Sequence, residues 1–365
     1  MRIKNLFLKN FRNYQDECFA FDDGLNVLFG RNAQGKTNCA EAVFYLCTGT
    51  SHRSKRDKQL IRQGQECAHI RAIAQGLYGD VEISADIYEN RREVKINGNK
   101  ISKNADILGN VYAVLFSPTE LRLIQDGPDE RRRFLNVSIS QLSKTYYVAL
   151  LRYNKILEQR NNLLKNRDVS LIYDTLPVWD EQLCKYGAII ARHRADFITS
   201  LSPIASEIHA FLTDGAEKLE ISPEKKYVGD DKELAKRLFA ELSNNYDRDI
   251  RLGYTASGPH RDDIDILIDG IDAKTYASQG QMRTATLSIK LAEVEIFKSV
   301  AGEYPVLILD DVMSELDLPR RKKLLERTQD LQTIITCTHA ERVLYGKKAN
   351  KIRIENGKIK NDVKK

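Results

Sequence analysis

The spacing of apolar residues changes several times along the chain, and each change predicts a different kind of element. Apolar runs predict four short strands, at residues 3–9, 17–21, 25–29 and 111–116. Apolar and polar residues alternate strictly over 81–88, and Asn97-Gly98 has the composition of a tight hairpin turn. We therefore expect an antiparallel meander within residues 68–101.

Apolar residues between 120 and 250 recur at helical spacing. Pro128, followed by two acidic residues, predicts a helix start that suits the helix dipole. The first helical stretch runs to about residue 167, and as one helix of about 38 residues it would be roughly 57 Å long. A second stretch at 177–213 can return alongside it. The run Arg131-Arg132-Arg133 is either a solvated helix face or a DNA contact.

Mixed helix and strand patterns resume after Gly253. The expected elements are an alternating strand at 264–268, a helix from 278, buried strands at 306–311 and 332–337, and a hairpin at 351–359 around Asn356-Gly357. We therefore expect an α/β fold in which residues 1–120 and 251–365 are two halves of one nucleotide-binding domain. Residues 121–250 would form a helical lobe inserted between them.

Composition narrows the class of protein. Of the 365 residues 42% are hydrophobic, which suffices for a sizeable core. The six cysteines are scattered without a C-x-x-C pair, so we expect no zinc site, no disulfide framework and a reducing cytoplasm. No apolar run approaches the ~20 residues that span a bilayer, so no membrane partner is expected. The net charge of +6 favours a polyanionic partner without identifying one.

The segment after the strand at 25–29 has the most specific chemistry. It reads Gly30-Arg31-Asn32-Ala33-Gln34-Gly35-Lys36-Thr37 and matches the phosphate loop G-x-x-x-x-G-K-[ST] between a strand and a helix. Its glycines let backbone N–H groups approach a polyphosphate at a helix N-terminus. Lys36 offers a positive charge to the terminal phosphates, and Thr37 offers a ligand to Mg2+. The alternative is a glycine turn between two core elements.

Two carboxylates end the buried-type strand at 306–311. A carboxylate beside a phosphate loop can hold Mg2+ directly or through water, and we assign this role to Asp310. The next residue, Asp311, can orient and polarise the attacking water. The alternative is a pair of acids at the start of a solvated loop. These features together predict a nucleotide-binding site that uses Mg2+, and the resemblance described next implies that the nucleotide is ATP.

Further motifs resemble a known family. Residues 277–281 align with the L-S-G-G-Q signature of ABC-type ATPases of the SMC class, except at the Leu and the first Gly, and residues 314–317 resemble their D-loop. The resemblance covers essentially the full length and narrows to the RecF family of bacterial DNA repair proteins. The segments that narrow it are Asn10-Phe11-Arg12-Asn13-Tyr14, Phe116-Ser117-Pro118, residues 131–135 and residues 258–263.

The resemblance implies a P-loop ABC/SMC-type ATPase head and a role for each site residue. Nucleotide contacts fall to Arg12, Gly30, Arg31, Asn32, Ala33, Gln34, Gly35, Lys36, Thr37 and Asn38. Metal ligands are Thr37 and Asp310, and the catalytic residues are Lys36, Asp311 and His339. The signature residues Ser278, Gln279, Gly280 and Gln281 would face ATP held by a second subunit, and Ser314 and Asp317 belong to the D-loop.

Plainer readings stand beside these assignments. Arg12 can be an exposed turn residue, Ser278 an ordinary helix cap, and His339 a structural histidine. Asp311 stands where many ABC ATPases have Glu. No glutamine near Ser117 fits the Q-loop of that family.

The resemblance also implies a function in recombinational repair, DNA replication and the SOS response to DNA damage. The family binds double-stranded and gapped DNA as an ATP-dependent homodimer, works with RecR and RecO, and helps to load RecA, with slow, DNA-stimulated ATP hydrolysis. DNA binding would rest on phosphate contacts and be salt-sensitive. The alternatives are a transporter ATPase subunit, which needs a coupling glutamine, and a structural SMC tether, which needs far longer heptad repeats.

Overall fold

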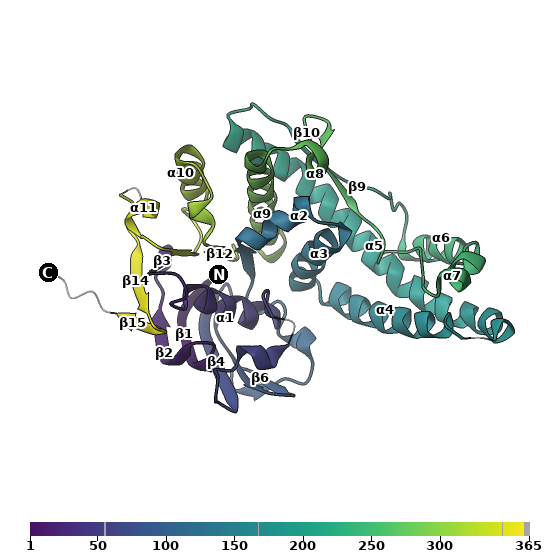
Figure 1. The fold of residues 1–365 in the computed structure, drawn as a ribbon, viewed down its shortest axis with the longest axis horizontal. Coiled ribbons are helices and arrows are strands. Elements are labelled where there is room, and N and C mark those ends of the chain that lie inside the picture. Colours follow the sequence, from purple (N-terminus) through teal and green to yellow (C-terminus); the bar gives the residue numbers. More distant parts are fainter. Residues whose placement is uncertain (55, 167, 345, 361–365) are drawn as a thin grey trace. The chain divides into compact units, whose positions relative to one another are not determined.

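Contacts within the chain divide the protein into two compact units. The computed structural model describes residues 1–54, 56–166, 168–344 and 346–360 (Figure 1). The first unit comprises Met1–Leu121, Ile208–Gly215 and Arg283–Lys365, and the second comprises Arg122–Glu207 and Ala216–Met282. Residues 361–365 of the expected C-terminal half lie outside the described residues.

The first unit contains a mostly parallel sheet with the strand order β15-β14-β3-β13-β12-β8. Its strands are β3 (Leu25–Phe29), β8 (Ala113–Phe116), β12 (Val306–Asp310), β13 (Thr333–Cys337), β14 (Asn350–Glu355) and the antiparallel β15 (Lys358–Lys360). Because β12 and β13 are buried throughout, they read in the sequence as continuous apolar runs. Phe29 pairs with Cys337 and Thr336 with Asp310, so these three strands end at the same edge.

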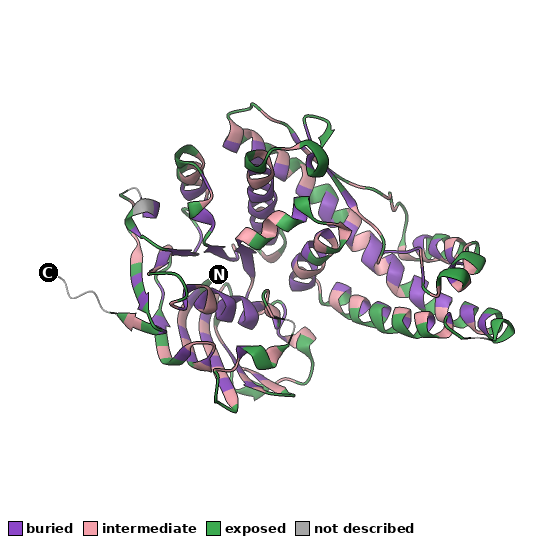
Figure 2. Ribbon diagram, in the orientation of Figure 1, coloured by how far each residue is buried: buried purple, intermediate pink, exposed green. Residues whose placement is uncertain are grey.

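A second sheet in this unit confirms the expected antiparallel meander. Its strand order is β2-β1-β4-β5-β6-β7. The strands are β1 (Arg2–Phe11), β2 (Tyr14–Ala20), β4 (Cys67–Gly76), β5 (Gly79–Tyr88), β6 (Arg92–Ile96) and β7 (Asn99–Lys100). Both sheets contact helix α1 (Lys36–Thr48), through β8, β12 and β13 on one side and β4 and β5 on the other. The helix is therefore buried almost all round (Figure 2).

Other helices complete the first unit. They are α9 (Gln279–Ala301), whose first residues belong to the second unit, α10 (Leu318–Arg327), α11 (Glu341–Leu344) and the 3-10 turns η1 (Asp57–Leu60), η2 (Asn104–Asp106), η3 (Pro118–Leu121) and η4 (Val312–Ser314). Among the described residues, no helix combines the length and the apolar character needed to cross a membrane.

The second unit is mainly helical. Its helices are α2 (Arg122–Gln125), α3 (Pro128–Leu142), α4 (Lys144–Leu163), most of α5 (Val169–Thr213), α6 (Asp231–Ser243), α7 (Tyr246–Leu252) and α8 (Ala273–Tyr276). The expected strand at 264–268 is β10 (Ile264–Ile268), between β11 (Ile271–Asp272) and β9 (Leu219–Pro223). Strand β9 has no counterpart among the elements expected from the sequence. Residues 216–282, which include the paired strands β9 and β10, belong to this unit. The expected division of the chain into an ATPase domain and an inserted lobe, with boundaries at 120 and 250, stays a prediction.

The single helix of about 38 residues is not formed, because the chain breaks at Ser143. That residue has extended backbone angles (φ −138°, ψ 106°), and its side chain accepts a hydrogen bond from the N–H of Tyr146. It therefore ends α3 and caps α4. Helix α5 begins at Val169, before the expected start, and continues through Pro177 and Pro203.

A buried ion triad holds the end of α4 in the second unit. Arg160 is fully buried, and its guanidinium donates to Asp180 Oδ1 at 2.5 Å and to Asp249 Oδ2 at 2.7 Å. Both carboxylates are fully buried as well. The same guanidinium donates to the hydroxyl of Thr255 at 2.8 Å. Because a buried charge is stable only when it is paired, this triad ties α4, α5 and α7 together.

Candidate functional site

The phosphate loop lies between β3 and α1, as the sequence predicts. Gly30 and Gly35 adopt φ of 150° and 120°, which favour glycine. A Cβ on Gly30 would lie 2.3 Å from the carbonyl oxygen of Ile354, and one on Gly35 would lie 2.8 Å from the Asn13 amide. Gly35 caps α1 without a side-chain hydrogen bond. The first N–H groups of this helix therefore have no side-chain cap and suit an anion.

Lys36 curls back over the loop. Its Nζ donates to the carbonyl oxygens of Gly30 at 2.7 Å and Arg31 at 2.8 Å. Burial lowers the pKa of Lys36, while the charges of Asp311, Cys337 and Asp310 act in the opposite direction. The ammonium group thus lies at the mouth of the loop on two neutral acceptors, which an anionic ligand can replace.

Thr37 and Asp310 are brought together as expected from the sequence. The Thr37 hydroxyl donates to Asp310 Oδ1 at 2.9 Å, and Thr336 on β13 donates to the same oxygen at 2.6 Å. Burial raises the pKa of Asp310, and the hydrogen bonds from Thr336 and Thr37 counteract this effect. A hydroxyl and a carboxylate in contact are hard oxygen donors, which fit Mg2+ that keeps its other ligands as phosphates and water. In residues 1–54, 56–166, 168–344 and 346–360 no cluster of three His, Cys, Asp or Glu offers an all-protein metal site.

Asp311 and His339 follow neighbouring strands and emerge at the same sheet edge. Asp311 has φ 56°, and its N–H donates to the Thr336 hydroxyl at 3.0 Å. The side chains of both residues are exposed. Ser314, in the expected D-loop, donates its hydroxyl to the Asp311 carbonyl at 2.8 Å, whereas Asp317 caps α10 through the N–H of Arg320. This edge thus presents carboxylate and imidazole groups near the loop, without a contact between them that assigns their roles.

Arg12 is bound by a buried glutamate in this structure. Its Nε and Nη2 donate to both oxygens of Glu41, at 2.9 and 2.7 Å, and its Nη1 donates to the Gln59 carbonyl. Glu41 is fully buried on α1. Arg12 is therefore a structural link between α1 and η1, and its nucleotide contact remains a prediction. The role of Glu41 cannot be predicted from the sequence, because an acid within a helix carries no local signal of a distant partner.

The signature residues open helix α9. The N–H of Ser278 donates to Gln281 Oε1 at 2.9 Å, and the N–H of Gln281 donates to Ser278 Oγ at 3.3 Å. This reciprocal pair is a capping box, which satisfies two N–H groups at the start of a helix. Gln279 and Gly280 between them are exposed. The geometry agrees with the alternative that Ser278 is an ordinary helix cap. The exposed first turn of the helix is still accessible to a ligand.

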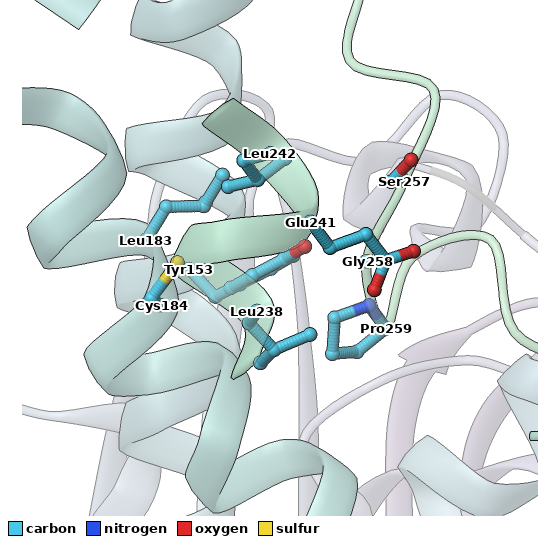
Figure 3. A pocket seen from close by; sticks show the side chains of 9 residues that line it. All are labelled: Tyr153, Leu183, Cys184, Leu238, Glu241, Leu242, Ser257, Gly258 and Pro259. Carbon is cyan, nitrogen blue, oxygen red and sulfur yellow. The ribbon is translucent and has the colours of Figure 1, made fainter. Parts of the chain in front are cut away.

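The motif at 258–263 has a structural role in the second unit. Gly258 has φ 122°, and a Cβ there would lie 2.8 Å from the hydroxyl of Tyr153. The hydroxyl contacts His260 Nδ1 at 2.7 Å, while His260 Nε2 contacts the Thr255 carbonyl at 3.0 Å. Burial lowers the pKa of His260 to about 4. Gly258 and Pro259 lie beside Tyr153 and line a small cavity (Figure 3). The cavity has a volume of about 10 Å³, which leaves little room for a ligand.

The three arginines at the start of α3 do not act as one group. We expected either a solvated helix face or a DNA contact, but two of the three bind other parts of the second unit. Arg131 is 6% exposed and donates to both oxygens of Asp263, at 2.6 and 2.7 Å. Arg132 donates to the Asp262 carbonyl at 2.7 Å, and Arg133 pairs with Glu130 across 3.5 Å. The first two arginines thus bind the 258–263 segment. This role depends on contacts between residues far apart in the sequence, so the local pattern does not predict it.

Comparisons with known proteins agree over nearly the whole chain. The family model described as RecF/RecN/SMC N terminal domain matches residues 2–361. A "DNA replication and repair protein RecF" from Ruminiclostridium cellulolyticum is 42% identical over 371 aligned positions, which cover 98% of this chain and 99% of that protein. One from Lachnoclostridium phytofermentans is 43% identical, covering 93% and 94% of the two chains.

Solved structures give the same picture. The "recombination mediator protein RecF-ATPrS in RecFOR pathway" has a TM-score of 0.90 at 36% identity and covers 98% of this chain and 97% of its own. An Smc head bound to the C-winged helix domain of ScpA has a TM-score of 0.60 at 16% identity, covers 99% of this chain and 96% of its own, and is similar in fold alone. The ATPase-head fold expected from the sequence is therefore confirmed, and this chain belongs to the RecF family.

Proposed function

We propose that this protein is a recombination mediator that binds ATP and DNA in recombinational repair. One ATP would bind the phosphate loop of one protomer, and its γ-phosphate would meet the signature of a second protomer. The resulting dimer clamps double-stranded DNA near single-strand gaps and assists the loading of RecA. Slow hydrolysis to ADP and phosphate then releases it. The contact of Thr37 with Asp310, at the end of a complete phosphate loop, carries this proposal.

The nucleotide-binding steps follow from the chain's own groups. Residues from Gly30 through Asn38 and Arg12 form the proposed nucleotide site, in which Lys36 exchanges two carbonyl acceptors for terminal phosphates. Thr37 and Asp310 would hold Mg2+, which would neutralise phosphate charge when bound. Asp310 is only 5% exposed, and this burial disfavours its anion. The two hydroxyl groups that donate to its carboxylate act in the opposite direction and favour the ionised form that Mg2+ needs.

Hydrolysis and assembly use the groups at the sheet edge and at α9. Asp311 would orient the attacking water, and His339 would sense the γ-phosphate. Ser278, Gln279, Gly280 and Gln281 would face a γ-phosphate in the partner, since a helix N-terminus favours anions. Ser314 and Asp317 would lie at the same junction.

The proposed partners follow from the relatives and the charge of the chain. The solved structures of RecF belong to the RecFOR pathway, which supports RecO and RecR as partners. The net charge of +6 supports binding to DNA phosphates, which would weaken as salt rises. All six cysteines are free, which supports a cytoplasmic location.

Mixing two inactive variants tests the composite site. Lys36→Ala removes the phosphate-binding lysine, and Ser278→Arg blocks the signature, so each homodimer has only defective sites. A mixed dimer would contain one intact site, so ATP hydrolysis should reappear on mixing. Ser299→Arg, at an exposed serine near the other end of α9, is the matched control and should retain activity alone. Absence of hydrolysis in a mixture that contains mixed dimers would contradict a signature acting in trans.

A further inference from the structure

Gln34 of the phosphate loop is bound by two segments that are distant in the sequence. Its carbonyl oxygen accepts hydrogen bonds from Asn13 Nδ2 at 2.8 Å and from the N–H of Gly357 at 3.0 Å. Its side-chain Oε1 accepts from the N–H of Asn356 at 2.6 Å. Asn356 and Gly357 form the turn of the C-terminal hairpin of β14 and β15, so this hairpin binds both the backbone and the side chain of one loop residue.

The hairpin also approaches the loop too closely for a side chain to fit. A Cβ on Gly357 would lie 2.5 Å from the carbonyl oxygen of Asn13, and one on Gly30 would lie 2.3 Å from the carbonyl oxygen of Ile354 on β14. Contacts this short are far below van der Waals distance, so both glycines are needed for the packing. The hairpin therefore touches the loop at its first glycine and again at Gln34.

The other side of this junction is held by two hydrogen bonds. Asn13 Oδ1 accepts from Asn38 Nδ2 at 2.8 Å, and the hydroxyl of the fully buried Tyr14 donates to the Gly35 carbonyl at 2.8 Å. Asn13 and Tyr14 lie at the turn between β1 and β2. The loop is thus fixed between one turn of the antiparallel sheet and the C-terminal hairpin.

This anchoring sets the direction of a loop N–H. The carbonyl of Gln34 and the N–H of Gly35 belong to one planar trans peptide, so they point in opposite directions. Because two donors hold the carbonyl toward the hairpin and Asn13, the N–H of Gly35 is directed away from them. Without these donors, the peptide could rotate and would lose its alignment for an anion.

We propose that the C-terminal hairpin is a positioning element of the nucleotide site. Through Asn356 and Gly357 it holds the Gln34–Gly35 peptide in the orientation that binds phosphate, before the ligand arrives. This inference rests on the proposed binding of ATP by the phosphate loop. A site that is preorganised in this way binds more tightly, because the ligand does not have to order it.

Two Asn-Gly turns of the same chain make a matched test. Asn356-Gly357 has φ of 50° and 69°, and Asn97-Gly98, between β6 and β7, has φ of 49° and 79°. A Cβ on Gly98 meets nothing within 4 Å. Gly357→Ala and Gly98→Ala therefore impose the same left-handed strain on alanine, and only the first displaces the hairpin from the loop.

The measurement is the dissociation constant of a fluorescent ATP analogue for the full chain, together with the unfolding temperature. Both variants should lower the unfolding temperature, but only Gly357→Ala should weaken ATP binding, by roughly three- to tenfold for the loss of about one hydrogen bond and its alignment. Gln34→Leu removes the acceptor of the Asn356 N–H while Gly357 stays, and should weaken binding in the same direction. It provides the test if Gly357→Ala does not fold.

The results separate the two proposals. Equal ATP affinity in Gly357→Ala and Gly98→Ala, with wild-type affinity in Gln34→Leu, would overturn the positioning role of the hairpin. If the wild type bound no analogue, or Lys36→Ala bound it as well as the wild type, the proposed nucleotide site itself would be wrong and the hairpin proposal would fall with it.

Discussion

Replacing Thr336 with valine separates the charge of Asp310 from the packing around it. Thr336 is fully buried on β13, and its hydroxyl donates to Asp310 Oδ1 at 2.6 Å and accepts from the Asp311 N–H at 3.0 Å. Valine keeps the shape but loses both contacts. Asp310 retains Thr37 as a donor, and the Asp311 N–H retains the Thr336 carbonyl at 3.3 Å. Since neither group is left without a partner, we expect destabilisation of only about 1–2 kcal/mol.

The effect on Mg2+ should be larger than the effect on folding. The hydrogen bond from Thr336 lowers the pKa of Asp310, which burial raises, so its loss raises this pKa further. A protonated Asp310 cannot bind Mg2+, so Mg2+-dependent ATP affinity should fall at a higher pH in Thr336→Val than in the wild type. A hydrogen bond to a charged group contributes roughly 1.5–3 kcal/mol, so the affinity of the variant should be lower by roughly tenfold or more in the pH range where its carboxylate is protonated and the wild-type carboxylate is ionised. At higher pH, where both carboxylates are ionised, the two affinities should converge.

Thr333→Val is the matched control on the same strand. Thr333 is 1% exposed, and its hydroxyl lies 3.5 Å from the Leu331 carbonyl. In the part of the chain that the structure describes, no carboxylate is among its hydrogen-bond partners. The assay is a titration of each variant with a fluorescent ATP analogue, with and without Mg2+, over a series of pH values. If both variants kept the wild-type pH dependence, Thr336 would not control Asp310 and the metal assignment would lose its support.

Three predictions concern the second unit. Arg160→Met leaves its two buried carboxylate partners without a cation and should destabilise the unit by about 3–5 kcal/mol. Urea unfolding monitored by hydrogen exchange measures this loss, and a loss below about 1 kcal/mol would contradict the triad. Gly258→Ala should lower stability by more than Gly270→Ala, whose Cβ has open space, because it meets the Tyr153 hydroxyl, and equal losses would contradict this contact. Burial lowers the pKa of His260 to about 4, below its usual value near 6.5, so stability is present above about pH 6.5 and is lost as pH falls toward 4, by up to about 3 kcal/mol. Replacing His260 with glutamine should flatten this dependence in unfolding experiments, and an unchanged slope would refute it.

The parts of the site that are built from residues adjacent in the sequence could be predicted from local sequence patterns. The strand, the glycine loop and the helix occur together because Val27 to Thr37 contains each signal in order, and the loop adopts the expected conformation. Asp310 could be placed beside Thr37 because parallel strands end at the same edge. The antiparallel meander followed from strict alternation within 81–88.

Contacts between distant segments could not be predicted in this way. The sequence predicts a turn at Asn356-Gly357, but it does not predict that this turn contacts Gln34. The contact depends on the pairing of β14 with β3, two strands that are far apart in the sequence. The burial of Arg131 on Asp263 is equally invisible, because arginine runs are usually exposed. Ser143 did carry a local signal, since serine is a preferred helix cap, but regular apolar spacing through residue 157 concealed the break.

Sedimentation of the protein with ATP, with ADP or without nucleotide tests the central claim most directly. Each sample is run with and without duplex DNA at fixed salt concentration. The account predicts that ATP alone converts monomers into dimers and that these dimers bind DNA more tightly, whereas ADP does neither. If ATP produced neither dimers nor tighter DNA binding, the proposal that ATP joins two protomers into a DNA clamp would be wrong.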